Sequence, residues 1–253
     1  LSPEELTALR SDQLAALSST QVAALSATQL RALSDAQVGA LTANQLKGLT
    51  AGALKAMTTT QLAGLTPTQI SGLGTLQVQA LTTNEIQSFT PTQMASLNES
   101  QVAALTVAQI KAMSNEQLLG LAPTQFGALT GTQLTSLTTT QFAQLSESHI
   151  TSLSITQVKG LSVGAVAALS TTQLNALRPS QLVVLSTTQI RGLTTTHLDM
   201  LSETQFGYLS GTQLSGLTNA QIASLSTSQI AALSINQLKG CLLYTSPSPR
   251  DYC

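Results

Sequence analysis

Charged and aromatic side chains are scarce in this chain. Lys, Arg, Asp and Glu together make up 8% of its 253 residues, aromatic residues make up 3%, and Trp is absent. Globular domains average about 25% charged residues, so the sequence does not resemble an ordinary domain. Disordered chains combine high charge with few apolar residues. This chain has the opposite composition, because 42% of its residues are hydrophobic and few are charged.

Positive charge is too sparse for a nucleic-acid partner. The ten Lys and Arg residues are spread thinly and the net charge is −1, whereas nucleic-acid binding needs a basic patch or stripe. No apolar run approaches the roughly 20 residues that a bilayer-spanning helix needs. We therefore expect neither nucleic-acid binding nor a membrane span.

Cysteine occurs only at the end of the chain, as Cys241 and Cys253. The segment from Cys241 to Asp251, CLLYTSPSPRD, is unrelated to the rest of the sequence and resembles the translation of a sequencing-library adapter. We expect residues 241–253 to be a disordered, non-repeat tail of artefactual origin; the alternative is a genuine terminus. A cysteine-free remainder fits an extracellular or cell-surface location, although a cytoplasmic one stays open.

An eight-residue repeat fills most of the chain. Thirty repeats run without insertion from Ser2 to Cys241. With each repeat numbered 1 to 8 from Ser2, position 1 is Ser or Thr in 25 repeats and position 4 is Gln in 24. Position 5 is apolar in all 30, and position 8 is Leu in 26. Position 7 is Ala, Gly or Ser in 26, and position 6 is variable. We expect the thirty repeats to be a fragment of a longer array.

Neither a continuous helix nor a strand preserves this period. At about 100° per residue, eight residues leave a drift of roughly 80°, so the apolar stripe of a long helix would wind around its surface. In a strand, positions 5 and 8 would point to opposite faces. The chain must therefore change direction once in each repeat.

The polar positions predict where each short helix begins. Ser or Thr at position 1 followed by Gln at position 4 is a capping box, in which the position-1 hydroxyl and the Gln side chain satisfy each other's backbone N–H groups. Proline is favoured at the first helical position, because its missing N–H is not needed there. Five of the seven prolines lie at position 2: Pro3, Pro67, Pro91, Pro123 and Pro179. We therefore predict a short helix over positions 2 to 7.

Such short helices need neighbours, because helix nucleation is costly. Positions 5 and 8 share one helix face, and a small residue at position 7 would allow close approach. The predicted fold is an all-α superhelical solenoid over residues 1–240, with one short capped helix per repeat, forming a monomeric rod. Cations at position 6 and three Phe residues at position 5 favour even-numbered repeats. That would suit two helices per coil without deciding the number.

No group of residues predicts a catalytic, cofactor or metal site. His149 and His197 replace the position-4 Gln, and a metal needs several converging ligands. We expect both to act as substitutes for the capping Gln, as Glu5 and Glu85 do. The repeats that contain Gly52 and Gly164 have Ala at position 4 and are expected to be weakly capped. The eleven acidic residues are scattered, so we expect no enzyme activity.

Hydroxyl rows leave one alternative open. Positions 1 to 3 read Thr-Thr-Thr at 58–60, 138–140 and 194–196. Aligned Thr rows on a regular solenoid are similar to those of ice-binding proteins. They suggest a lattice or glycan binder, although charged and amide residues at other position-3 sites interrupt the rows.

The repeat resembles the LTxxQ(I/V/L)xAL octapeptide arrays of large bacterial surface or secreted proteins, often of adhesin type. Repeats such as 226–233, STSQIAAL, carry the likeness, which extends from Leu1 to Gly240. The resemblance implies a structural spacer or scaffold with an unknown protein or surface partner, and it brings no catalytic residue or cofactor with it.

Overall fold

The computed structural model describes residues 2–242, and within them the secondary structure is entirely helical. The chain divides into two compact parts, Leu1–Ser136 and Leu137–Cys253. In each part, short helices follow one another at the period of the repeat. The predicted fold class, an all-α solenoid of short capped helices, is confirmed.

Each described repeat contributes one helix, and the helix begins at position 2 as predicted. In the first part these are α1 (Pro3–Thr7), α2 (Ser11–Ala15), α3 (Ser19–Ala23), α4 (Ala27–Ala32), α5 (Asp35–Ala40), α6 (Ala43–Gly48), α7 (Ala51–Lys55), α8 (Thr59–Ala63), α9 (Pro67–Ser71), α10 (Thr75–Ala80), α11 (Thr83–Gln87), α12 (Pro91–Ala95), α13 (Glu99–Ala104), α14 (Val107–Ala112), α15 (Asn115–Gly120), α16 (Pro123–Gly127) and α17 (Gly131–Thr135). In the second part they are α18 (Thr139–Gln144), α19 (Glu147–Ser152), α20 (Ile155–Gly160), α21 (Val163–Ala167), α22 (Thr171–Asn175), α23 (Pro179–Leu182), α24 (Thr187–Arg191), α25 (Thr195–Asp199), α26 (Glu203–Gly207), α27 (Gly211–Leu214), α28 (Asn219–Ala223), α29 (Thr227–Ala231) and α30 (Ile235–Leu242).

The capping box starts these helices. In α8, the Thr58 hydroxyl accepts from the backbone N–H of Gln61 at 3.1 Å, and the Thr58 N–H donates to Gln61 Oε1 at 2.8 Å. Four repeats begin with a residue that lacks an accepting side chain: Arg10, Gly74, Ala122 and Arg178. There the Gln still accepts from the position-1 N–H, so one half of the box suffices to start a helix.

Two consecutive extended residues change the chain direction between helices. Leu33 at position 8 has φ −63° and ψ 137°, and Ser34 at the next position 1 has φ −69° and ψ 159°. Among the described residues no φ is positive, not even at glycine. The turn between helices therefore needs no left-handed residue, and Ser or Thr can occupy it.

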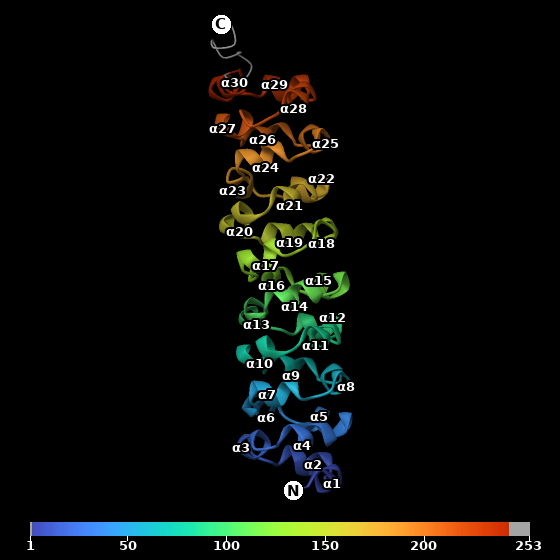
Figure 1. Cartoon of the computed structure of the whole chain (residues 1–253). Helices are drawn as coiled ribbons and strands as arrows, with labels where there is room; N and C mark the ends of the chain where they lie inside the picture. Colours follow the sequence, from blue (N-terminus) through green and yellow to red (C-terminus); the bar gives the residue numbers. More distant parts are fainter. Residues whose placement is uncertain (1, 243–253) are drawn as a thin grey trace, which may run out of the picture. The chain divides into compact units, whose positions relative to one another are not determined.

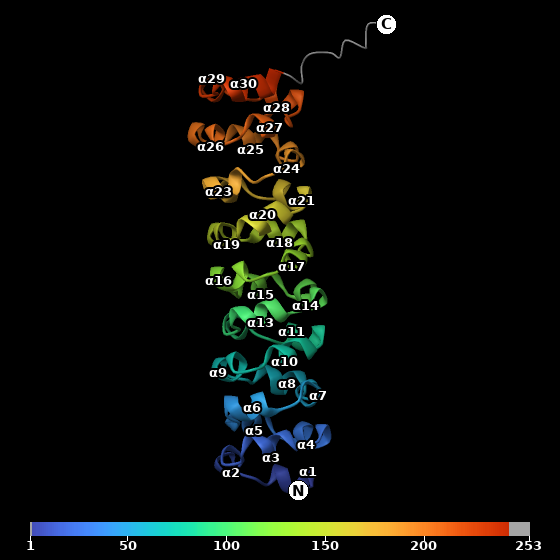
Figure 2. The ribbon, with the colours of Figure 1, turned by 90° about the vertical axis from the view of Figure 1, so that its left-hand side faces the viewer.

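Helices three apart along the chain pack against each other. In the first part, α7, α10 and α13 form one such row, visible along one side of Figure 1. In the second part, α26 and α29 are another pair, stacked at one side of Figure 2. Side-chain hydrogen bonds reach back to the fourth repeat before. A coil of the solenoid thus contains between three and four repeats, not the two suggested by the even-numbered preference.

The core of each coil consists of the residues at positions 5 and 8. Leu62 and Ile70 at position 5 have no exposed surface, and Leu65 and Leu73 at position 8 are 3% and 4% exposed. The predicted shared face is therefore the buried face. Each such side chain contributes roughly 1.5–3 kcal/mol when it is fully buried.

Glycine at position 7 has a packing role. Gly72 has a helical backbone with φ −80°, so its conformation suits any residue. A Cβ atom at this site would lie 2.7 Å from the Cβ of Ala43, which is at position 2 of the third repeat before. A Cβ atom at Gly216 would likewise lie 2.9 Å from the carbonyl oxygen of Thr187, which is also at position 2 of the third repeat before. The predicted close approach at position 7 therefore occurs between helices three apart.

We expect Gly72→Ala to destabilise the coils around α9 by about 1–3 kcal/mol, because the added methyl group overlaps Ala43. The double variant Gly72→Ala with Ala43→Gly should recover most of this loss. Gly64→Ala is the matched control: its position-7 methyl group would meet no atom closer than 3.5 Å, and it should gain up to about 1 kcal/mol of helix propensity. Amide hydrogen exchange measures these local changes. Equal effects at Gly64 and Gly72 would contradict this packing role.

The predicted tail falls mostly outside the described residues. Helix α30 continues through Cys241 to Leu242, and residues 243–253 lie beyond the region that the structure describes. The prediction of an adapter-derived segment therefore stays a prediction. No helix among the described residues combines the length and apolarity needed to cross a bilayer.

Candidate functional site

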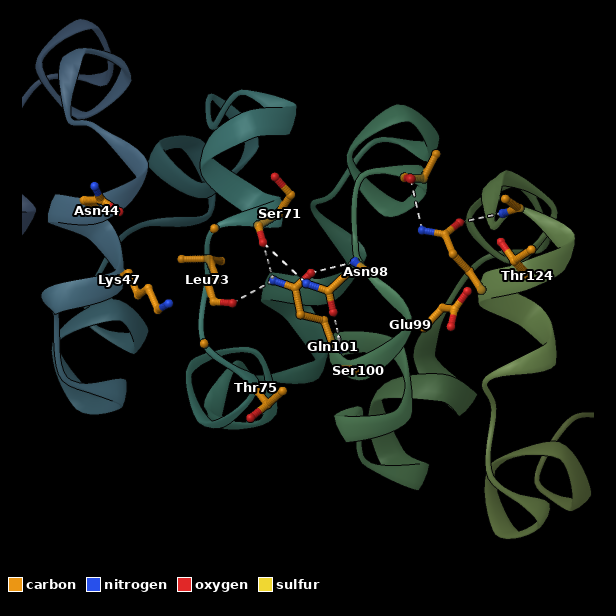
Figure 3. A pocket seen from close by; sticks show the side chains of 15 residues that line it. Asn44, Lys47, Ser71, Leu73, Thr75, Asn98, Glu99, Ser100, Gln101 and Thr124 are labelled. Carbon is orange, nitrogen blue, oxygen red and sulfur yellow. Dashed lines mark hydrogen bonds between the residues drawn. The ribbon is translucent and has the colours of Figure 1, made fainter.

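The glutamine at position 4 joins two coils. Gln101 is 1% exposed, and its Oε1 accepts from the backbone N–H of Asn98 at 2.7 Å. Its Nε2 donates to the carbonyl oxygens of Ile70 and Leu73, both at 2.8 Å. Figure 3 shows the bond to Leu73. One amide thus caps the start of its own helix and the end of the helix four repeats earlier.

This bridge recurs through both parts of the chain. Donation to the position-5 and position-8 carbonyls of the fourth repeat before is seen for Gln37, Gln45, Gln61, Gln69, Gln77, Gln93, Gln101, Gln109, Gln117, Gln125, Gln133, Gln173, Gln181, Gln189, Gln213, Gln221 and Gln229. Gln13 and Gln21, which have no fourth repeat before them in this chain, are exposed. Stacking of coils therefore buries the amide.

The sequence pattern predicts only half of this role. It assigned the Gln to the capping box, where only its oxygen is needed. A signal for the other half was present, since Glu completes a capping box equally well but occurs at position 4 only as Glu5 and Glu85. A preference for the amide over the carboxylate indicates that the NH₂ group has a partner of its own.

The two histidines take the place of the glutamine, as predicted. The Nδ1 atoms of His149 and His197 accept from the backbone N–H groups of Ser146 and Thr194, each at 3.2 Å. His197 also hydrogen-bonds the backbone of Leu169, the position-8 residue four repeats earlier. Because Nδ1 accepts, we assign the proton to Nε2, which donates to the Leu169 carbonyl. A neutral imidazole thus reproduces both halves of the bridge.

His197 should make its coil sensitive to acid. Burial lowers the pKa of the His197 imidazole below its ordinary value, and the bond to Leu169 partly opposes this shift. A pKa that is lower in the folded than in the unfolded chain gives stability that is present above the unfolded value of about 6.5. That stability is lost as the pH falls through the folded value. Protonation of Nδ1 would also place an N–H group against the N–H of Thr194, which now donates to it.

We expect acid to reduce amide protection around α22 and α25 in the natural chain and to have less effect in His197→Gln. Hydrogen exchange at pH 7 and pH 5, corrected for intrinsic rates, measures the difference. The variant removes only the titration of residue 197. Acid effects that come from the other ionisable groups are therefore the same in both proteins. The same acid-dependent loss in both proteins would contradict the assignment.

Glu85 is a buried carboxyl group in a bridging position. It is 6% exposed and accepts from the Thr82 N–H at 2.5 Å, which completes its half of the capping box. A carboxylate has no hydrogen to give to the carbonyl groups of Leu54 and Met57, the counterparts of those that receive the amide elsewhere. This repeat therefore has a weaker link to its preceding coil.

Glu85→Gln should stabilise the coils around α7 and α11 by about 1–2 kcal/mol, because it supplies the missing donor and removes a buried charge. Glu5→Gln is the matched control: Glu5 caps Ser2 in the same way at 2.7 Å but is exposed, so it should change stability by less than about 0.5 kcal/mol. Local hydrogen exchange reports both effects. A neutral or harmful Glu85→Gln would contradict the bridge.

Grooves lie along the seams between coils, and the linings of three show their character. One is lined by Asn44, Lys47, Ser71, Asn98 and Thr124, among other residues, and Figure 3 shows hydroxyl and amide groups along it. The other two repeat its halves in the second part of the chain. In one of them, Arg191 and Gly216 occupy the repeat positions that Lys47 and Gly72 occupy in the first groove. In the other, Glu147 and Thr172 occupy the repeat positions of Glu99 and Thr124. The grooves are thus features of the repeat, with isolated charges and many hydroxyl groups.

The predicted hydroxyl rows are exposed only in part. At 58–60, the side chains of Thr59 and Thr60 are exposed, while Thr58 is half-buried and its hydroxyl accepts the capping bond. Elsewhere, position-1 and position-3 hydroxyls bond each other, as in Ser146 with Ser148 at 2.8 Å. Much of the hydroxyl capacity therefore serves the helices themselves.

Ionisable groups are dispersed over the described residues. No group of three or more His, Cys, Asp or Glu residues is close enough to hold a metal within residues 2–242. The ion pair of Arg10 with Asp12, at 2.9 Å, lies on the surface with both side chains about 70% exposed. Such an exposed pair contributes only about 0–1 kcal/mol.

Comparison with known proteins supports the repeat. Residues 22–51 match the family model of the ALTTAQ repeat, a segment that includes all of α4, α5 and α6. None of the curated proteins matches the chain. Together with the regular helices, the family match identifies a repeat protein; the predicted adhesin-like origin is not tested by it.

Proposed function

We propose that this chain is a non-catalytic spacer or scaffold within a larger bacterial protein at the cell surface or outside the cell. The supporting observation is the position-4 bridge. Gln occupies position 4 in 24 of the 30 repeats, and where it is buried it donates and accepts within the array, as Gln101 does with Asn98, Ile70 and Leu73. Its chemistry is used to join coil to coil, which is what a long structural element requires.

The uniform coils also suit extension. Because each repeat contacts mainly the third and fourth repeats before and after it, a longer array needs no new type of contact. An array of this kind can separate the domains at its two ends by a distance set by repeat number. Its exposed positions 2, 3 and 6 are free to vary and offer a surface for protein partners.

Small-angle X-ray scattering of the purified chain tests the spacer. A compact protein of this length has a radius of gyration of about 18 Å. We expect a clearly larger value, with a distance distribution typical of an elongated particle, measured at the lowest usable concentration. A value near that of a compact globule would contradict the proposal. For the cell-surface assignment, we expect secretion or anchoring signals in the surrounding reading frame.

A second candidate is a glycan or lattice binder, favoured by the recurrence of hydroxyl-lined grooves and by exposed residues such as Thr59 and Thr60. Thermal hysteresis of the chain tests ice binding, with Thr60→Lys and Thr140→Lys together as the comparison. Isothermal titration with oligosaccharides tests glycan binding. No hysteresis and no binding heat would remove this candidate and leave the spacer unaffected.

A further inference from the structure

Two of the grooves repeat one arrangement of side chains, once in each part of the chain. Each contains a cation at position 6 of one repeat, together with Ser at position 6 and Gly at position 7 of the third repeat after it. These residues are Lys47, Ser71 and Gly72 in the first groove and Arg191, Ser215 and Gly216 in the second. We refer to these two sites as the cationic grooves.

The cation of each groove is open to a ligand. Lys47 and Arg191 are exposed, and neither forms an ion pair within the part of the chain that the structure describes. Figure 3 shows the Lys47 side chain directed from its own helix toward the segment around Leu73. Of the described residues that line the groove of Arg191, none is acidic. Because ammonium and guanidinium groups can only donate hydrogen bonds, each groove offers donors to an anionic group.

The serine of each groove offers the opposite chemistry. Ser71 donates its hydroxyl hydrogen to the carbonyl oxygen of Thr68 at 3.0 Å, and Ser215 donates to that of Thr212 at 2.7 Å. A hydroxyl group has one hydrogen and two acceptor lone pairs. These serine oxygens can therefore accept from a ligand but have no hydrogen left to give it. A ligand that uses the whole groove must bring both an anionic group and a hydrogen-bond donor.

The position-7 glycine brings the two sides of each groove together. Ala43 and Thr187 lie in the repeats of the two cations. An added Cβ atom at Gly72 would lie 2.7 Å from the Cβ of Ala43, and one at Gly216 would lie 2.9 Å from the Thr187 carbonyl oxygen. Only glycine allows this approach without a shift of the backbone. The serine, one residue before the glycine, therefore lies on the repeat that packs closely against the repeat of the cation.

We propose that the cationic grooves bind acidic carbohydrate. Lys47 and Arg191 donate to the anionic group of the ligand, and Ser71 and Ser215 accept from a neighbouring sugar hydroxyl. A sugar acid carries both groups on one ring, which matches the two sides of the groove. The described lining includes no aromatic ring on which a neutral sugar could stack, so charge is the main source of selectivity. This inference rests on the glycan-binding candidate, whose ligand class it names, and does not depend on the spacer.

Isothermal titration of the full chain at low salt, where exposed charges are least screened, tests the proposal. The acidic ligands are tetragalacturonate, which carries carboxylates, and a heparin tetrasaccharide, which also carries sulfates. Fully methyl-esterified tetragalacturonate keeps sugar hydroxyls without charge, and sodium sulfate has charge without hydroxyl groups. We expect at least one acidic oligosaccharide to bind about tenfold or more tightly than the ester and than sulfate.

The ligands separate failure of this inference from failure of the glycan binder. Equal binding of the ester and the acidic oligosaccharides would overturn the inference and leave a glycan binder. Equal binding of sulfate would also overturn it, because the groove would then recognise charge alone. If no oligosaccharide binds, both the inference and the glycan binder are wrong, whereas the scattering test of the spacer is unaffected.

Two double variants of equal net charge separate the grooves from general attraction. Lys47→Gln with Arg191→Gln removes the groove cations. Lys111→Gln with Lys159→Gln removes two exposed cations at the same repeat position that line neither groove. We expect the first pair to weaken binding of the acidic oligosaccharides by about tenfold, the size of a lost charge-assisted hydrogen bond, and the second by less than about twofold. Equal weakening by the two pairs would overturn the proposal.

Ser71→Ala with Ser215→Ala tests the acceptor side of the grooves. We expect about threefold weaker binding of the acidic oligosaccharides, typical of one neutral hydrogen bond, and unchanged binding of sulfate, which has no hydroxyl group to donate. Far-UV circular dichroism of all three double variants should match that of the natural chain. Unchanged oligosaccharide affinity in the serine variant would overturn the pairing of an anionic group with a sugar hydroxyl.

Discussion

Replacing a buried bridging glutamine by glutamate should strongly destabilise the array, although the capping hydrogen bond is kept. In Gln109→Glu, the new carboxylate can still accept from the Thr106 N–H, which bonds Gln109 Oε1 at 2.7 Å. It loses the donors that reach Val78 and Leu81 at 2.9 and 2.7 Å. Because the site is 1% exposed, the carboxylate would face two carbonyl oxygens without water.

We expect a loss of about 3 kcal/mol or more in the coils that contain α10 and α14, the size found when a buried charge is left without a partner. Amide exchange of these helices measures the loss, since stability in a solenoid is local and unfolding of a long array need not be all-or-none. Exchange should accelerate by roughly 100-fold or more. The damage should shrink at acid pH, because a protonated carboxyl group has a hydrogen to donate.

Gln21→Glu is the matched control for this prediction. It makes the same change at the same repeat position, and Gln21 Oε1 accepts from Ser18 at 2.8 Å. Its side chain is exposed and its Nε2 has no partner in the described residues, so the expected change is below about 0.5 kcal/mol. Equal losses at Gln21 and Gln109 would show that donation to the preceding coil contributes nothing of its own, and would contradict the bridge.

Local features of the fold could be predicted from the sequence because they depend on neighbouring residues. Helix starts follow from pairs such as Thr58 with Gln61, three residues apart, and the buried face follows from pairs such as Leu62 with Leu65. The number of repeats per coil could not be predicted. It depends on how far Leu33 and Ser34 turn the chain, and small differences in those torsion angles change which helices meet.

The bridge was missed for a related reason. Gln37 and Leu6 are 31 residues apart, and no pattern within one repeat connects them. A sequence in which every repeat is alike gives no paired variation that would mark which repeats touch. The chain breaks its own regularity in a few places, at Glu85, His149 and His197, and there the substitutes show what the site requires. Both histidines supply an acceptor at the cap, and His197 also bonds the preceding coil at Leu169, whereas Glu85 supplies an acceptor alone.

The register of the array should tolerate the loss of whole repeats but not of half a repeat. Deletion of residues 98–105 removes one complete repeat. Every later glutamine would then meet the carbonyl groups of a different repeat, but those groups lie at the same positions 5 and 8. We expect helix content per residue and amide protection of the neighbouring coils to stay close to those of the natural chain. Deletion of residues 98–113, two repeats, should behave alike.

Deletion of residues 98–101 should be far more harmful. It removes Asn98 and Gln101, which cap α13, and leaves four apolar and small residues, 102–105, between two intact repeats. These four residues cannot form a capped helix, and they displace the following repeats by half a period relative to the coil before. Gln109 and Gln117 would no longer align with Val78 and Ile86, to which they donate at 2.9 and 2.8 Å.

The expected result is loss of protection over about one coil on each side of the four-residue deletion, with the rest of each array intact, because repeats contact only nearby repeats. Far-UV circular dichroism should show a loss of helix larger than the number of deleted residues explains. Hydrogen exchange locates the affected helices. If four-residue and eight-residue deletions cause equal damage, the bridges do not set the register, and the apolar spine alone holds the coils together.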